Sequence, residues 1–184
     1  GEISTLDAVS VGDFVAYGPM QSFIFQSGIN DNGCREAPSS GILVQTPSGA
    51  GEIILQVNGV QIRLGSTVYM QASPDDYLTV SVLEGRATLT ANGNTQIVPA
   101  GSRGRVPLGT DGLASGTPEY PEPYTRLAVR SVPVSLLPQQ IVIARPLSED
   151  DIQTTLSGST ASTGGTTSGT NNAVTVVYDA PPNG

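Results

Sequence analysis

Apolar and polar residues alternate with a period of two along most of the stretch from Ile42 to Leu108. In the segment Glu52–Leu64, for example, every second residue is Ile, Leu or Val on each side of Asn58-Gly59, and most of the residues between them are polar or charged. Successive side chains of a strand point to opposite faces, so this alternation predicts strands with one buried and one exposed face. The stretch is therefore predicted to form the antiparallel β core of the protein.

Two Asn-Gly pairs divide this core, at Asn58-Gly59 and Asn92-Gly93. Asn-Gly tolerates the two positive φ angles of a type I′ turn, which makes it the strongest short signal for a β-hairpin. Gly85 allows a further turn, and Pro99-Ala100-Gly101 ends the pairing. We predict an all-β fold, either an antiparallel β-sandwich or a β-roll built from hairpins.

The sequence flanking the core suggests four further segments. Residues 1–41 are predicted to form N-terminal strands and a loop, and residues 42–108 the core. Residues 109–156 form a Pro-rich strap with a short strand, residues 157–172 a Ser/Thr/Gly linker, and residues 173–184 a C-terminal β-strand and tail. This division follows the shifts in composition along the chain.

The strap is rich in proline, because eight of the fourteen prolines lie between Pro99 and Pro146. Proline presets φ and removes a backbone donor, so the segment is expected to run extended over the domain surface. Tyr120 and Tyr124 are expected to pin it by packing. Thr125–Arg130 is predicted to form one or two helical turns, and Gln140–Ala144 a short strand.

The linker Ser157–Asn172 contains no charge and nothing larger than Thr or Asn. Such composition is typical of a flexible tether, which for sixteen residues spans roughly 20–24 Å on average and roughly 55 Å when extended. Its hydroxyl groups are candidate O-glycosylation sites: Ser159, Thr160, Ser162, Thr163, Thr166, Thr167, Ser168 and Thr170.

A strongly β-prone segment follows the linker, and a single strand there needs a sheet edge to pair with. The edge belongs either to the same chain or to a neighbouring copy, where the strand would be added to the neighbour's sheet. Both alternatives remain open from the sequence. The candidate residues for subunit interaction are Val174, Thr175, Val176, Val177 and Tyr178.

Charge narrows the range of functions. The chain carries 16 acidic residues against eight basic ones, all of them Arg, for a net charge of −8 and a pI near 4.2. Without a basic cluster, binding to nucleic acid or to an anionic membrane surface is disfavoured. No apolar run approaches the roughly 20 residues that span a bilayer, so membrane insertion is not expected.

The missing residue types exclude several reactions. Without His there is no Ser-His-Asp or Cys-His pair and no His metal site. Without Lys there is no Schiff base and no phosphate-loop lysine. We expect no cofactor, no metal and no catalytic residues. A glycosidase that uses Asp75 or Asp76 with Glu84 as its carboxylate pair is a less favoured hypothesis than either non-enzymatic function.

Four further features have a structural and a functional interpretation. Cys34, the single cysteine, is either a small packed side chain or a thiol for an intermolecular disulfide or lipid link. Asp31-Asn32-Gly33 resembles part of a calcium loop but lacks the spaced acidic ligands. Asp75-Asp76 is better explained as a turn than as a metal site. Arg103 and Arg105, on one strand face, either bind an anion or, as we prefer, pair with nearby acids.

The core resembles the β-rich domain of FecR-type proteins over roughly Cys34–Val106. The resemblance rests on Val57–Leu64, Ser66–Tyr69 and Leu78–Thr90 (LTVSVLEGRATLT), followed by Asn92-Gly93 and Pro99-Ala100-Gly101. It implies an extracytoplasmic β domain used for interaction, in signalling or in surface assembly. It supplies no catalytic residues.

Two functions fit these observations. The first is a secreted structural protein, a β subunit that self-associates into an extracellular filament, sheath or matrix, with its C-terminal strand added to a neighbour. The second is a cell-surface or extracytoplasmic module of FecR-like type that binds or senses a small-molecule ligand whose identity the sequence leaves open. Both place the protein outside the cell or on its surface.

Overall fold

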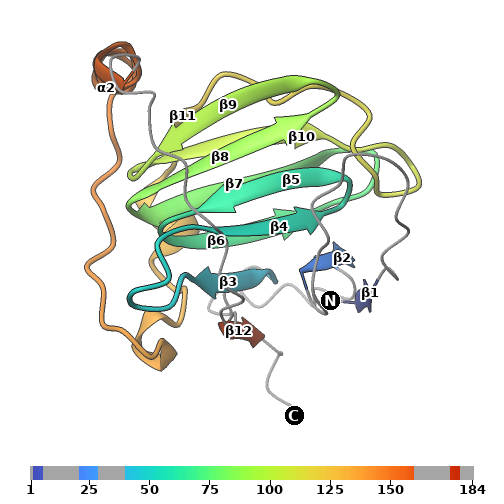
Figure 1. The fold of residues 1–184 in the computed structure, drawn as a ribbon, viewed down its shortest axis with the longest axis horizontal. Helices are drawn as coiled ribbons and strands as arrows, with labels where there is room; N and C mark the ends of the chain where they lie inside the picture. The colour runs from blue at the N-terminus through green and yellow to red at the C-terminus, as the bar shows by residue number, and fades with distance from the viewer. Residues whose placement is uncertain (1, 6–20, 29–39, 160–174, 179–184) are drawn as a thin grey trace.

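Two six-stranded β-sheets lie face to face in the computed structural model, which describes residues 2–5, 21–28, 40–159 and 175–178 (Figure 1). The first sheet contains, in spatial order, β1 (Glu2–Thr5), β2 (Ser22–Gln26), β4 (Ile53–Val57), β5 (Val60–Leu64), β8 (Arg86–Ala91) and β9 (Asn94–Pro99). The second contains β11 (Glu122–Pro123), β10 (Ser102–Pro107), β7 (Tyr77–Glu84), β6 (Thr67–Ala72), β3 (Ile42–Gln45) and β12 (Thr175–Tyr178). The predicted all-β sandwich is confirmed.

The core winds between the sheets hairpin by hairpin. β4–β5 pair in the first sheet, β6–β7 in the second and β8–β9 in the first, and β10 then returns to pair with β7. Both Asn-Gly pairs turn as predicted, with φ of 51° and 79° at Asn58-Gly59 and 47° and 76° at Asn92-Gly93. These are the paired positive angles of a type I′ turn.

Three of the connections that change sheet lie together at one end of the sandwich, which we call the crossing end. They are Gly65-Ser66, Gly85 and Ala100-Gly101, and the amide of Ala100 donates to the carbonyl of Gly85 at 3.0 Å. Gly85 has φ of 70°, and a Cβ there would lie 2.7 Å from the carbonyl oxygen of Gly65. Only glycine fits this position, because a side chain would be strained and would also collide with the neighbouring connection.

The main core fills the space between the sheets. Ile62, Leu64 and Leu89 from the first sheet meet Met70 and Val80 from the second, and all five are fully buried. Burying side chains of this kind contributes about 1.5–3 kcal/mol each. The alternation along the strands thus places one apolar set inward, as predicted.

The N-terminal segment adds to the first sheet through β2, which pairs in parallel with β4 and antiparallel with β1. Phe23 and Phe25 of β2 are buried in the main core. This agrees with the prediction of strands in residues 1–41 for the described part of that segment. The residues between β1 and β2 lie outside the described ranges.

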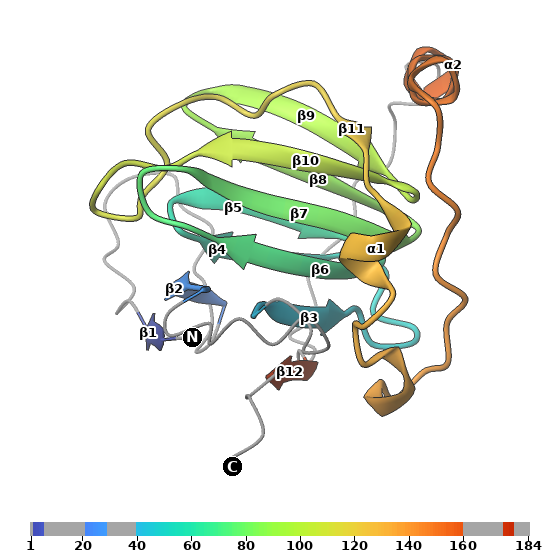
Figure 2. The ribbon, with the colours of Figure 1, turned by 180° about the vertical axis from the view of Figure 1, so that it is seen from behind.

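The Pro-rich strap packs on the outer face of the second sheet at one end, where α1 lies (Figure 2). Leu43, Tyr69 and Leu83 point outward from that sheet and form a second core with strap residues that include Tyr124 and Val129. The strap contains α1 (Arg126–Val129) and the 3₁₀ turn η1 (Val134–Leu136). The helix predicted at Thr125–Arg130 is confirmed as a single turn, and its N-cap Thr125 accepts a hydrogen bond from Ala128.

Two expectations for the strap are wrong. Tyr124 is buried and its hydroxyl donates to the carbonyl of Ala144 at 2.6 Å, but Tyr120 is 59% exposed and does not pin the strap by packing. Gln140–Ala144 is not a strand. Its apolar residues do share one face, since Ile141 and Ile143 both pack on the second core. The segment lies against a face of the sheet, however, and the strands beneath it already pair with one another.

The helix α2 (Glu149–Ser159) was not predicted. Ser148 and Asp151 form a capping box: the Ser148 hydroxyl accepts from the Asp151 amide at 3.2 Å, and the Asp151 carboxylate accepts from the Ser148 amide at 3.3 Å. Ile152 is its one fully buried side chain. The first three residues of the predicted linker, Ser157–Ser159, therefore belong to a helix.

Candidate functional site

The terminal strand β12 occupies an outer edge of the second sheet. It pairs antiparallel with β3 of the same chain, with Thr175 opposite Gln45 and Tyr178 opposite Ile42. The strand character predicted for this segment is confirmed for Thr175–Tyr178, and Val174 lies outside the described residues. On its other side β3 pairs with β6, so β12 completes the hydrogen bonding of β3.

The helix that precedes this strand in sequence lies at the opposite edge. α2 packs beside β9 and β11, and β11 and β12 are the two outer strands of the second sheet. Figure 1 shows α2 and β12 at opposite ends of the stacked strands. With neighbouring strands roughly 4.8 Å apart, the two outer strands of this sheet are about 24 Å apart. β12 is thus held at its position by sheet pairing rather than by a short connection.

Arg103 and Arg105 pair with acids of the strap, which is the interpretation preferred above over an anion-binding site. Arg103 contacts Glu122 at 2.9 Å, and Arg105 contacts Glu119 at 2.8 Å and Glu122 at 3.1 Å. The guanidinium of Arg105 also lies 4.7 Å from the centre of the Tyr77 ring. These side chains are about one-third exposed, so each pair stabilises the strap by less than about 1 kcal/mol. Both arginines are neutralised and offer no anion site.

The same cluster affects a neighbouring tyrosine. Hydrogen bonding to Glu119, together with the charge of that carboxylate, raises the pKa of Tyr77, which Arg105 partly opposes. Burial raises the pKa of Tyr124 in the second core. The hydrogen bonds from Ser148 lower the pKa of Asp151 at the start of α2. Each of these shifts accompanies a structural contact of the strap or of α2.

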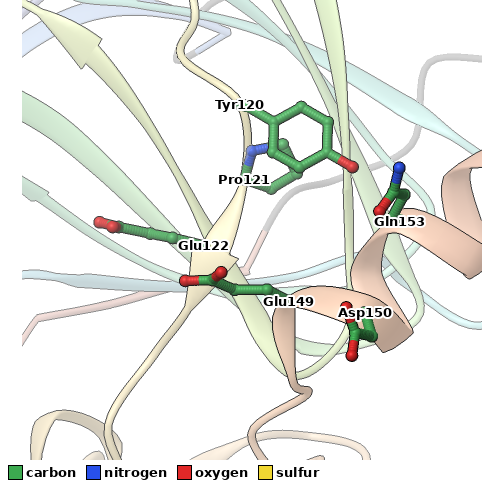
Figure 3. A pocket seen from close by; sticks show the side chains of 6 residues that line it. All are labelled: Tyr120, Pro121, Glu122, Glu149, Asp150 and Gln153. Atoms are coloured by element: carbon green, nitrogen blue, oxygen red, sulfur yellow. The ribbon is translucent and has the colours of Figure 1, made fainter.

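A hollow lies between the strap and α2 (Figure 3). Tyr120, Pro121 and Glu122 line one side, and three residues of α2, Glu149, Asp150 and Gln153, line the other. Glu122 is already neutralised by two arginines. Glu149 and Asp150 stand in the first turn of α2, where acidic side chains stabilise a helix through its dipole. The acidic residues of this hollow are therefore accounted for by the fold.

A second hollow, of about 360 Å³, opens at the crossing end, and we call it the crossing-end pocket. Four segments meet there: the end of β3 with the loop that follows it, the Gly65-Ser66 connection, Glu84-Gly85, and the strap at Gln139. No sequence pattern predicts this site. Its members are turn and strand-end residues from distant parts of the chain, and the local sequence of each suggests only a turn.

Buried amides and hydroxyls form a chain across this pocket. Gln45 is 3% exposed and is joined to Gln139 by two hydrogen bonds, one to the carbonyl at 2.9 Å and one from the amide at 3.0 Å. Gln45 also donates to the Thr67 hydroxyl at 3.3 Å, which in turn donates to Glu84 at 3.4 Å. The chain ties the strap to the strand that β12 covers and ends at an exposed carboxylate.

The carboxylate pair considered for glycoside hydrolysis does not form. Asp75 and Asp76 lie in the β6–β7 turn, with φ of 59° at Asp75, which confirms the preferred interpretation of a turn. Glu84 stands at the other end of β7, about 26 Å away by the rise of a strand. Catalytic carboxylates of glycosidases lie within about 10 Å. In the part of the chain that the structure describes, no three acidic or Cys side chains gather into a metal site.

Several candidate residues fall outside the described ranges. These are Cys34, the calcium-like loop at Asp31, and all the hydroxyl residues proposed for glycosylation except Ser159, which ends α2. Of the helices described, none is long and apolar enough to cross a membrane.

Comparison with known proteins gives no relative: no family model, no curated protein and no solved structure matches this chain. The resemblance to FecR-type domains therefore rests on the sequence motifs alone.

Proposed function

We propose that this protein is a secreted structural subunit that self-associates by donating β12 to the β3 edge of a neighbouring copy. The observation that carries the proposal is the attachment of β12. Among the described strands it pairs with β3 alone, and fifteen residues separate it from α2, which lies at the far edge of the sheet. We further propose that the site of action is extracellular or at the cell surface.

The edge that β12 covers favours exchange. Without β12, the four residues of β3 would present their outer backbone groups to solvent, and an unpaired edge is a template for a strand from another chain. The side chains of Ile42–Gln45 are all buried, so the edge cannot avoid pairing by fraying without exposing both cores. A β12 strand from any copy satisfies the edge equally well.

The connection length supports exchange as well. Fifteen residues separate Ser159 from Thr175, and fully extended they reach at most about 50 Å. That limit is about twice the width of the second sheet, at whose two edges α2 and β12 lie. Delivery of β12 to an adjacent copy therefore needs no change in the sandwich itself.

The geometry of such exchange determines the product. If two copies exchanged β12 reciprocally, a closed dimer would form. If each copy donated to the next, the contact would be head-to-tail and would give an open polymer. We favour the polymer, which is the filament, sheath or matrix expected from the sequence.

The proposal predicts that assembly depends on β12. Deleting residues 173–184 removes the donated strand but leaves the two core clusters, so the variant should be monomeric by light scattering. The full chain, whose monomer mass is 18.9 kDa, should give larger species and ordered polymers in electron micrographs. Deleting residues 179–184 alone keeps β12 and serves as the matched control, which should assemble like the full chain. Assembly that survives the longer deletion unchanged would refute the proposal.

The binding or sensing module is the second candidate function. A specific observation favours it, namely the crossing-end pocket with its exposed carboxylate. Under this hypothesis, the protein is an interaction domain of FecR-like type, and its ligand enters between the loops of the crossing end.

A further inference from the structure

We propose that the crossing-end pocket binds small organic cations that carry a primary ammonium group. The inference develops the binding alternative and does not depend on strand exchange. It rests on the hydrogen bonds of the pocket, on its charge and on its size.

Three side chains of the pocket, Gln45, Thr46 and Thr67, already donate their hydrogen bonds within the protein. The two amide hydrogens of Gln45 go to Thr67 and to the carbonyl of Gln139. The Thr67 hydroxyl donates to Glu84, and the Thr46 hydroxyl donates to the carbonyl of Leu64 at 3.2 Å. Acceptor capacity remains, because a carboxylate and a hydroxyl each accept more than one hydrogen bond. The carboxylate of Glu84, which accepts one hydrogen bond from Thr67, can therefore accept further hydrogen bonds from a ligand that is rich in donors.

Ser66 lacks a hydrogen-bond partner. It is 6% exposed, lines the pocket, and its Oγ makes no hydrogen bond within the described residues, although its backbone amide donates to the Thr46 hydroxyl at 3.1 Å. A buried polar atom without a partner costs free energy, and it is uncommon in a folded protein. A bound ammonium would supply the missing partner.

The charge of the pocket favours a cation among the ligands that are rich in hydrogen-bond donors. Glu84 is the only charged residue among those that line the pocket, and it forms no ion pair with an Arg in the described part of the chain. The pocket thus has a single negative charge at its rim and no positive charge. An anionic ligand is disfavoured, and an ammonium forms charge-assisted hydrogen bonds to the carboxylate.

Size limits the ligand to a small molecule. A hollow of about 360 Å³ lies at the lower end of the range for ligand pockets. Gly49 and Gly51 form part of the wall, and a Cβ at either would meet no atom within 4 Å, so the backbone is open on that side. The wall has no aromatic residue on which a sugar ring or a quaternary ammonium would stack.

The test is a titration of the ¹⁵N-labelled full chain with putrescine at neutral pH. The neutral diol of the same chain length and the dianion succinate serve as comparison ligands. Saturable shifts should appear at the amides of residues 45, 46, 48–51, 65–67, 84–85 and 139 with putrescine only. Glu84→Gln, an exposed and nearly isosteric change, should weaken binding about tenfold or more, since it removes the single charge. Ser66→Ala should weaken binding by a smaller factor.

Glu149→Gln is the matched control, because it removes an exposed acid from the hollow beside α2 and should leave binding unchanged. Equal binding of the diol, an unaltered titration of Glu84→Gln, or the absence of saturable shifts at these amides would each overturn the inference. None of these results bears on the assembly of the protein, which is read from its mass in solution.

Discussion

Asn58 shows how one residue can serve both a turn and the packing around it. Its backbone takes the positive φ of the β4–β5 turn, while its fully buried side chain holds two other segments. The amide donates to the carbonyls of Phe25 and Gly112 at 3.0 and 2.7 Å, and the side-chain oxygen accepts from the amide of Phe25 at 3.2 Å. The sequence predicted the turn, but the second role depends on β2, which lies more than thirty residues away in sequence.

We predict that Asn58→Gly destabilises the protein by about 2–4 kcal/mol, because glycine keeps the turn but leaves buried backbone groups without partners. Asn92→Gly is the matched control. Asn92 has the same turn geometry but is exposed and makes only one such bond, to Gly116 at 2.9 Å, so the cost should stay below about 1 kcal/mol. Urea unfolding of both variants measures the difference. Equal losses would show that the buried bonds of Asn58 do not anchor β2 and the Gly112 loop.

Tyr124 links the second core to alkaline stability. Its pKa is raised by burial, so the folded state holds the phenolic proton more tightly than the unfolded chain does. The resulting stability is fully present below the unfolded pKa of about 10 and is lost as pH rises through the higher folded pKa. The sequence could indicate an aromatic anchor for the strap, but not which of its tyrosines was buried.

We predict that Tyr124→Phe lowers the free energy of unfolding by about 1 kcal/mol near neutral pH, through loss of the hydrogen bond to Ala144. Part of the decline in stability above about pH 10 should disappear in this variant. The exposed Tyr120→Phe should behave as the wild type in both respects. Urea unfolding across the alkaline range tests this, and an unchanged alkaline decline in Tyr124→Phe would contradict the assigned linkage.

At the scale of elements, the predictions held where a residue pattern is local. Period-two alternation and Asn-Gly turns identified the strands of both hairpins, and β12 was predicted from its β-branched residues alone. The exchange of sheets at Gly65-Ser66, Gly85 and Ala100-Gly101 was not predictable in this way. A glycine permits a turn, but the packing of both sheets decides whether the next strand stays or crosses.

Two elements show where local patterns mislead. The strand predicted at Gln140–Ala144 has the composition of a strand but lies on a sheet face rather than at an edge. α2 was missed because it has a single fully buried side chain and ends in the hydroxyl-rich tract. The signal that would have located it is Ser148-Glu149-Asp150-Asp151, an N-cap followed by an acidic first turn before Ile152.

At the scale of the whole molecule, the two outer strands of the second sheet differ in how they are secured. β11 is fixed by ion pairs to the arginines of β10, from Glu122 within the strand and from Glu119 just before it. The helix α2 packs beside the same strand. β12, at the opposite edge, is joined to β3 by four paired residues and is separated from α2 by fifteen residues of sequence. The crossing-end pocket lies beside the same edge, since Gln45 lines the pocket and stands opposite Thr175. No sequence pattern places these features together, because they meet only in the folded sheet.

The central claim is that β12 of one copy pairs with β3 of another, and disulfide trapping tests it most directly. Leu43 and Val177 stand directly opposite each other, and such pairs lie within the range that a disulfide can bridge. With Cys34→Ser in every chain, Leu43→Cys and Val177→Cys are made in separate chains and coexpressed. We predict a disulfide-linked dimer that contains one chain of each kind. A disulfide that forms only within the doubly substituted chain, and never between the two singly substituted chains, would contradict the account.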